Sequence, residues 1–138
     1  MPPRLKSLFG PLCVALFAAL LASPLARGLG TCTDDAALHI TRAVEIEKML
    51  RLGHFFPRWA PDLAHGFGYP LFHYYAPLSA NVLVFFHLLG VPYGAGLHLT
   101  FFVALLGAGL GLYAFASDLW GPRAGLVAAV GYMSAPYF

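Results

Sequence analysis

The longest charge-free stretch of the chain runs from residue 63 to residue 117. These 55 residues contain no Asp, Glu, Lys or Arg. A surface in contact with water needs charged side chains, whereas a helix crosses a membrane with about 20 apolar residues. The stretch is therefore long enough for two crossings and too poor in charge to be the surface of a soluble domain.

The composition of the whole chain supports a membrane protein. Of 138 residues, 59% are apolar and 10% are charged, against about 25% charged in a typical soluble domain. The net charge of +2 excludes a nucleic-acid binder that relies on bulk positive charge. Cys13 lies inside an apolar run and Cys32 beyond it, so neither a disulfide nor a metal framework is predicted.

The predicted fold class is an all-α integral membrane protein, a partial helical bundle in the cell (plasma) membrane. Residues 1–26 are predicted to form an N-terminal anchor, with a 19-residue apolar run from Leu8 to Ala26. A cleaved signal peptide is the alternative, but the run is long for one and Pro24 lies where cleavage would occur. Arg4 and Lys6 precede the run and are expected to keep the N-terminus in the cytoplasm.

Residues 76–138 are predicted to hold the remaining crossings, over residues 77–91, residues 96–116 and a last run that begins at Ala124. Three closely spaced glycines in the second of these favour close helix packing, namely Gly107, Gly109 and Gly111. Trp120 is expected at headgroup depth. The last run reaches Phe138 after 15 residues, which cover only about 22 Å of a ~30 Å hydrocarbon core. We therefore expect the chain to be the N-terminal fragment of a longer multi-pass protein.

Residues 27–75 are predicted to form an external loop, and most of the charge lies there. Ten of the fourteen charged residues fall between residues 27 and 62. Residues 34–52 contain no Pro or Gly and predict an amphipathic helix at the membrane surface, with a cap near Thr31 and a stop at Gly53. Four side chains of this helix are expected on its solvated face, namely Glu45, Glu47, Lys48 and Arg51.

The start of this helix carries the candidate reactive groups. Asp34 and Asp35 could act as a general base or hold a divalent cation, or they could only complement the helix dipole. On a helical wheel Asp35, His39 and Arg42 lie within about 60° of one another. His39 could be a ligand or a proton relay, and Arg42 could bind a phosphate or pair with a carboxylate.

Residues 53–75 form a segment rich in aromatic residues, proline and glycine. Eight of the 22 residues from 54 to 75 are Phe, Tyr or Trp. Such density serves either an interfacial belt or the stacking of an apolar or sugar-containing ligand. The regular Pro and Gly positions predict a defined loop shape and favour the ligand. The candidate loop-shaping and stacking residues are Trp59, Asp62, Tyr69, Tyr74 and Tyr75.

Two stretches of this loop resemble a known family. DDAALHITR (residues 34–42) and GHFFPRWAPDLAHGFGYPLFHYYAPL (residues 53–78) are similar to the N-terminal part of bacterial multi-pass proteins labelled 6-pyruvoyl-tetrahydropterin-synthase-related. These in turn resemble the GT-C glycosyltransferases, which use lipid-phosphate-linked sugars. The chain shows no zinc-ligand trio on a soluble domain, so pterin synthase chemistry is not expected.

The resemblance implies a catalytic role for Asp34 or Asp35 as the base that activates an acceptor hydroxyl. The donor would be a polyprenyl-phosphate sugar at the outer face, with Arg42 or Arg58 neutralising the departing phosphate and His39 nearby. The alternative is a non-enzymatic multi-pass protein, either a transporter or an assembly scaffold. Transporters place charged groups near the midplane, but the predicted crossings carry only His87 and His98.

Overall fold

The computed structural model describes residues 3–26 and 35–135, and every regular element in these ranges is a helix. The helices are α1 (Pro3–Ala26), α2 (Ala36–Arg51), α3 (Leu71–Tyr74), α4 (Leu78–Leu88), α5 (Tyr93–Trp120) and α6 (Pro122–Ser134). The chain divides into two compact units. Residues 28–100 form the α2–α4 unit, and residues 1–27 and 101–138 form the α1–α6 unit, so the two units share the sequence of α5.

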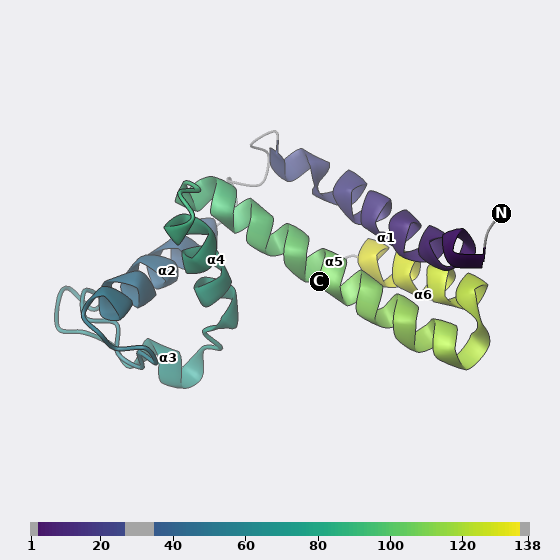
Figure 1. Ribbon diagram of the computed structural model, residues 1–138. Helices are drawn as coiled ribbons and strands as arrows, with labels where there is room; N and C mark the ends of the chain where they lie inside the picture. Colours follow the sequence, from purple (N-terminus) through teal and green to yellow (C-terminus); the bar gives the residue numbers. More distant parts are fainter. Residues whose placement is uncertain (1–2, 27–34, 136–138) are drawn as a thin grey trace. The chain divides into compact units, whose positions relative to one another are not determined.

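The α2–α4 unit is built on the packing of α2 against α4 (Figure 1). Ala36, Ala43 and Ile46 are buried on α2 at a spacing that places them on one side of the helix. They join a core with residues of the other elements, namely Ala60, Leu71, Phe72, Ala80, Leu83, Val84 and Leu97. The predicted helix over residues 34–52 is confirmed with slightly shorter bounds, and the proposed cap from Thr31 to Asp34 lies outside the described residues.

The predicted crossing over residues 77–91 is only partly helical. Its helix, α4, has 11 residues and a length of about 16 Å, roughly half of the ~30 Å hydrocarbon core. Pro77 precedes the helix, and Gly90 with a φ of +92° follows its end. The helix α4 therefore does not span a membrane by its own length, and its buried side chains pack on α2 instead.

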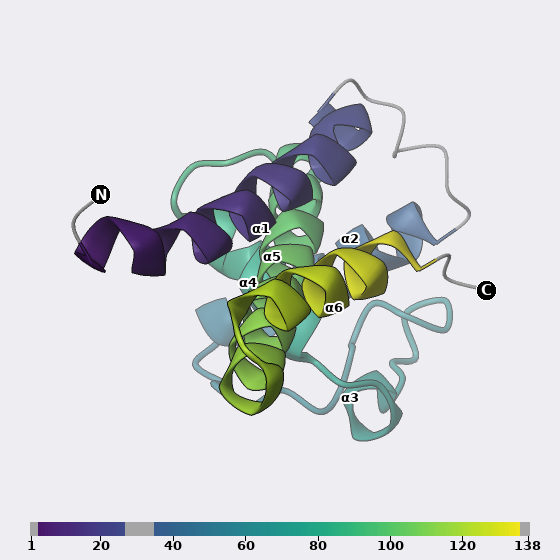
Figure 2. The same ribbon diagram turned by 90° about the vertical axis from the view of Figure 1, so that its right-hand side faces the viewer.

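The α1–α6 unit contains α1, residues 101–120 of α5, and α6. Helices α1 and α6 lie side by side (Figures 1 and 2) around a small buried core of Val14, Ala18, Ala129 and Met133. Apolar side chains also cover the outside of this unit, for example Leu8, Leu12, Leu16 and Leu20 at every fourth position of α1. An apolar outer stripe of this kind marks a contact surface, either for lipid or for another protein.

Small residues allow the helices of this unit to approach closely. A Cβ atom on Gly125 of α6 would lie 2.8 Å from the backbone oxygen of Tyr113. Of the three glycines noted in the sequence, only Gly109 makes such a contact, with Met133 and Val14, whereas Gly107 and Gly111 have no atom within 4 Å of an added Cβ.

Among the described residues, α5 is the one helix long and apolar enough to cross a membrane, by length and composition. It has 28 residues and contains the predicted crossing over residues 96–116. The apolar part of α1, Leu8–Pro24, is shorter. A turn follows α5, with Gly121 at a φ of +88° and Pro122 in the first turn of α6.

Candidate functional site

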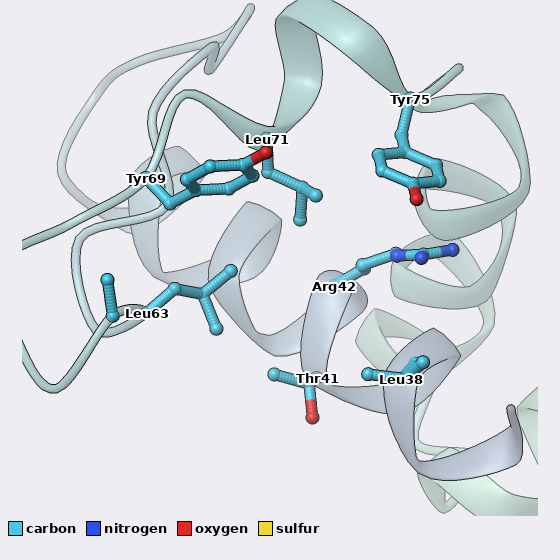
Figure 3. A pocket seen from close by; sticks show the side chains of 8 residues that line it. Leu38, Thr41, Arg42, Leu63, Tyr69, Leu71 and Tyr75 are labelled. Carbon is cyan, nitrogen blue, oxygen red and sulfur yellow. The ribbon is translucent and has the colours of Figure 1, made fainter. Parts of the chain in front are cut away.

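An open pocket of about 450 Å³ lies in the α2–α4 unit between α2 and the loop that leads to α3 (Figure 3). Its lining is mainly apolar, with two tyrosines and one guanidinium. The lining residues are Leu38, Thr41, Arg42, Leu63, Ala64, Tyr69, Leu71 and Tyr75. Apolar walls with a few placed polar groups are typical of ligand sites.

Arg42 supplies the only formal charge among the side chains that line this pocket. Its guanidinium carbon lies 4.3 Å from the centroid of the Tyr75 ring, a distance that gives a cation–π contact. Figure 3 shows the guanidinium extending beneath that ring. No ion pair joins Arg42 to a carboxylate among the described residues. Because stacking uses the face of the guanidinium, its N–H groups in the plane are left to bind an anion.

Tyr69 reaches the pocket from a closed loop over residues 60–69. The backbone amides of Ala60 and Tyr69 each donate a hydrogen bond to the other's carbonyl oxygen, at 2.8 and 2.9 Å. At the tip of the loop, Ala64 and His65 have φ angles of +52° and +58°, a conformation that costs a non-glycine residue about 1–2 kcal/mol. The loop holds Leu63, Ala64 and Tyr69 over α2 despite this cost.

Polar groups of α2 hold this loop in place. Glu45 is only 3% exposed, and its side chain accepts a hydrogen bond from the Asp62 backbone amide at 3.2 Å. The Asp62 carboxylate in turn accepts two hydrogen bonds from Lys48 Nζ, at 2.5 and 2.6 Å. Asp62 therefore joins the loop to α2 through its backbone amide and its carboxylate.

Asp35 lies one residue before α2, and its side chain is exposed and makes no capping hydrogen bond. Arg42 follows Asp35 by seven positions, which is close to two helical turns. Both residues therefore fall on the same side of the helix, about 10.5 Å apart along its axis. His39 lies between them and is half-buried. Asp34 lies outside the described residues.

Arg58 is not part of this pocket. It lines a second, smaller pocket of about 200 Å³ with Phe55, Phe56, Pro57, Phe72, Pro77 and Asn81. The structure thus separates the two arginines that the resemblance offers as phosphate ligands.

The remaining predicted aromatic residues have different surroundings. The Trp59 indole packs against Gly68, where an added Cβ would lie 2.2 Å from Nε1. Trp59 therefore helps to shape the loop rather than the pocket. Tyr74 is largely exposed and does not line the pocket.

Glu47 is a polar centre that sequence reasoning missed. Its carboxylate accepts hydrogen bonds from the Tyr93 hydroxyl and from Arg51 Nε at 2.9 Å. His87 stacks on the Tyr93 ring with centroids 3.8 Å apart, and its Nε2 lies 3.7 Å from Glu47 Oε2. Burial alone would raise the pKa of Glu47, but these hydrogen bonds and the nearby positive charges lower it below its ordinary value.

The expectation that Glu45 and Glu47 belong to a solvated face is therefore wrong, since they are 3% and 6% exposed. The two residues are buried by different neighbours. Glu47 falls on the same side of the helical wheel as Ala36 and Ala43, which pack towards α4. Glu45 falls on the opposite side, which the loop over residues 60–69 covers. The alignment of Glu47 with the two alanines was a signal present in the sequence.

The described residues contain no group of three or more His, Cys, Asp or Glu that could hold a metal ion. The divalent cation suggested for Asp34 and Asp35 stays a prediction, because Asp34 lies outside the described ranges. Comparison with protein families, curated proteins and solved structures found no match.

Proposed function

We propose that this chain belongs to a multi-pass membrane protein of the GT-C type, which binds a polyprenyl-phosphate-linked sugar in the Arg42 pocket at the outer membrane face. The observation that carries the proposal is a guanidinium without a carboxylate partner among the described residues, stacked on Tyr75 in an apolar, aromatic pocket. A lipid-linked sugar phosphate presents the matching groups: an anion, a sugar face that stacks on tyrosine, and an apolar chain.

The apolar helices support the membrane location. Helix α5 is long enough to cross a bilayer, and the exposed leucines of α1 suit a lipid environment. In this proposal α1 is the N-terminal anchor, with Arg4 and Lys6 on the cytoplasmic side. The α2–α4 unit, which follows α1 in the chain, would then lie outside.

The reaction that this arrangement supports is a displacement at the anomeric carbon. Asp35 or Asp34 takes the proton from an acceptor hydroxyl, and the oxygen attacks the anomeric carbon. The bond from that carbon to the phosphate oxygen breaks, and the polyprenyl phosphate leaves with the electron pair. Arg42 pairs with the growing negative charge. Asp35 and Arg42 lie two helical turns apart, which leaves room for a sugar between the carboxylate that acts as base and the phosphate that Arg42 binds.

Binding and transfer are tested separately with the full chain in lipid nanodiscs. Arg42→Gln should weaken the binding of a polyprenyl phosphate about 10–100-fold, because a charge-assisted contact contributes about 1.5–3 kcal/mol. Arg123→Gln, an exposed arginine at the start of α6, is the matched control and should bind like the wild type. Equal affinity of the Arg42 variant and the control would refute the site.

Transfer of a radiolabelled sugar from the polyprenyl-phosphate donor tests the chemistry. Asp34→Asn or Asp35→Asn should abolish transfer without weakening donor binding. If both variants transferred sugar at the wild-type rate, the acidic-pair mechanism would be wrong. Donor binding without any transfer by the wild type would favour the alternative, a non-enzymatic membrane protein that binds the lipid-linked sugar.

A further inference from the structure

The segment from Leu52 to Arg58 presents an apolar edge of the α2–α4 unit, here called the Phe55 edge. Leu52, Phe55 and Phe56 are 64%, 75% and 91% exposed. Three large apolar side chains within five residues are rarely left in water, and such a group marks a contact surface. Helix α2 ends at Arg51 and Gly53 has a φ of +87°, so these three residues lie outside the helix and its buried face.

The second pocket lies at this edge and carries a positive charge. Phe55, Phe56 and Arg58 line it from the edge, and Phe72 and Asn81 from α3 and α4. Arg58 is exposed and forms no ion pair among the described residues. From residue 50 to residue 61 the chain contains no acidic residue. Arg51 in this stretch pairs with Glu47, so the positive charge of the edge comes from Arg58. The charge of the edge thus complements an anionic surface.

Chain continuity brings this unit to a membrane surface. Helix α5 has 28 residues, but about 20 residues suffice for the hydrocarbon core. Residues 101–120 supply those twenty, and the first eight residues of α5, 93–100, belong to the α2–α4 unit. With α5 in the bilayer, this unit directly precedes the crossing in the chain, without a linker.

We propose that the Phe55 edge inserts into the headgroup layer of the bilayer that α5 crosses. Phe55 and Phe56 reach the boundary with the acyl chains, where aromatic side chains are favoured. Arg58 binds the phosphate of an anionic phospholipid at the second pocket, since basic side chains at a membrane surface attract anionic lipid. The partner is the lipid surface itself, and this binding is separate from the lipid-linked sugar in the Arg42 pocket.

A spin label at position 56 tests the insertion in the full chain. Phe56→Cys is labelled in a background with Cys13→Ser and Cys32→Ser and placed in nanodiscs of phosphatidylcholine and phosphatidylglycerol. Collisions of the label with oxygen, which concentrates in lipid, should exceed those with a water-soluble nickel chelate. Phe67→Cys is the matched control, since Phe67 is 86% exposed on another loop, and its label should collide more with nickel.

Greater nickel than oxygen collision at position 56 would overturn the insertion. If the labels at both positions collided more with oxygen than with nickel, the assignment of the membrane contact to this edge would be wrong.

The lipid that co-purifies with the chain tests the binding of the headgroup by Arg58. The wild type extracted from the nanodiscs should retain a higher fraction of phosphatidylglycerol than the bilayer contained. Arg58→Gln should lose this enrichment and Arg123→Gln should keep it, whereas unchanged enrichment in Arg58→Gln would remove Arg58 from the site. Neither readout uses a sugar donor, so a failure here is distinct from a failure of the proposed function.

Discussion

At the scale of single residues, the carboxylate of Glu47 joins three parts of the α2–α4 unit. It lies on α2, its partner His87 lies on α4, and Tyr93 is the first residue of α5. A buried carboxylate is costly unless its oxygens are hydrogen-bonded. Here Tyr93 and Arg51 donate these hydrogen bonds, so the Glu47 carboxylate connects α2 to the start of α5.

This link predicts a pH dependence of stability. The pKa of Glu47 is lowered in the folded chain, so its contribution is complete above the ordinary pKa of 4.5 and is lost as the pH falls through the lowered value. At neutral pH, Glu47→Gln should cost about 1.5–3 kcal/mol, and the difference from wild type should shrink in acid. Chemical unfolding followed by circular dichroism measures both.

A matched control separates this network from a general effect of polar substitutions. Tyr93→Phe removes a donor to Glu47 and should also destabilise, whereas Tyr132→Phe removes the hydroxyl of an exposed tyrosine on α6 and should not. A Glu47→Gln variant as stable as the wild type at neutral pH would contradict the account.

Two glycines of the loop over residues 60–69 predict different costs for the same substitution. Both have positive φ angles, +88° at Gly66 and +79° at Gly68, so alanine at either should cost about 1–2 kcal/mol in the backbone. At Gly68 the new Cβ would also collide with the Trp59 indole, whereas Gly66 faces open space. Gly68→Ala should therefore destabilise more than Gly66→Ala.

The fluorescence of Trp59 reports this difference directly. In a Trp120→Phe background, Gly68→Ala should shift the emission of Trp59 and Gly66→Ala should leave it unchanged. The same emission in both variants would mean that the indole does not pack on Gly68.

The sequence predicted individual site residues with mixed success. Arg42, Tyr69 and Tyr75 were singled out, and the structure brings them together in one pocket. Glu45 and Glu47 were misplaced because the exposure of a helical position depends on what covers it. The covering elements, α4 and the loop over residues 60–69, are distant from these residues in sequence.

At the scale of elements, α2 has two functional faces. One face packs on α4 through Ala36 and Ala43, and the other carries the loop over residues 60–69 and the Arg42 pocket. An amphipathic helix on a membrane surface would need only one apolar face. The pattern of residues 34–52 predicted the helix correctly but could not show that its second face is covered by a loop.

Helix α6 offers a test of packing in the α1–α6 unit. Alanine at Gly125 would place its Cβ 2.8 Å from a backbone oxygen of α5 and 1.9 Å from Ser117 Oγ, whereas at Gly131 nothing lies within 4 Å. Backbone cannot move aside as a flexible side chain does, so overpacking should cost about 1–3 kcal/mol. Gly131→Ala should be neutral or stabilising, since alanine favours helix by about 1 kcal/mol over glycine.

Thermal unfolding of the two alanine variants in micelles, with the wild type beside them, measures this difference. Equal melting temperatures for Gly125→Ala and Gly131→Ala would show that α6 does not contact α5 as described.

At the scale of the whole molecule, the chain contains two units of different character. The α1–α6 unit has a small core and an apolar exterior, whereas the α2–α4 unit contains the buried carboxylates and both pockets. The uneven charge distribution of the sequence predicted this contrast. It could not predict that α4 packs within the second unit, because hydropathy does not distinguish a short core helix from a membrane crossing.

Photo-crosslinking of a bound donor tests the central claim, that the Arg42 pocket holds a lipid-linked phosphate. A polyprenyl phosphate with a diazirine near the phosphate is activated on the full chain in nanodiscs, and the labelled peptides are mapped by mass spectrometry. Labels should fall on the pocket segments, residues 38–42 and 63–75, and Arg42→Gln should reduce them. Labels confined to other segments, or equally strong in Arg42→Gln, would contradict the account.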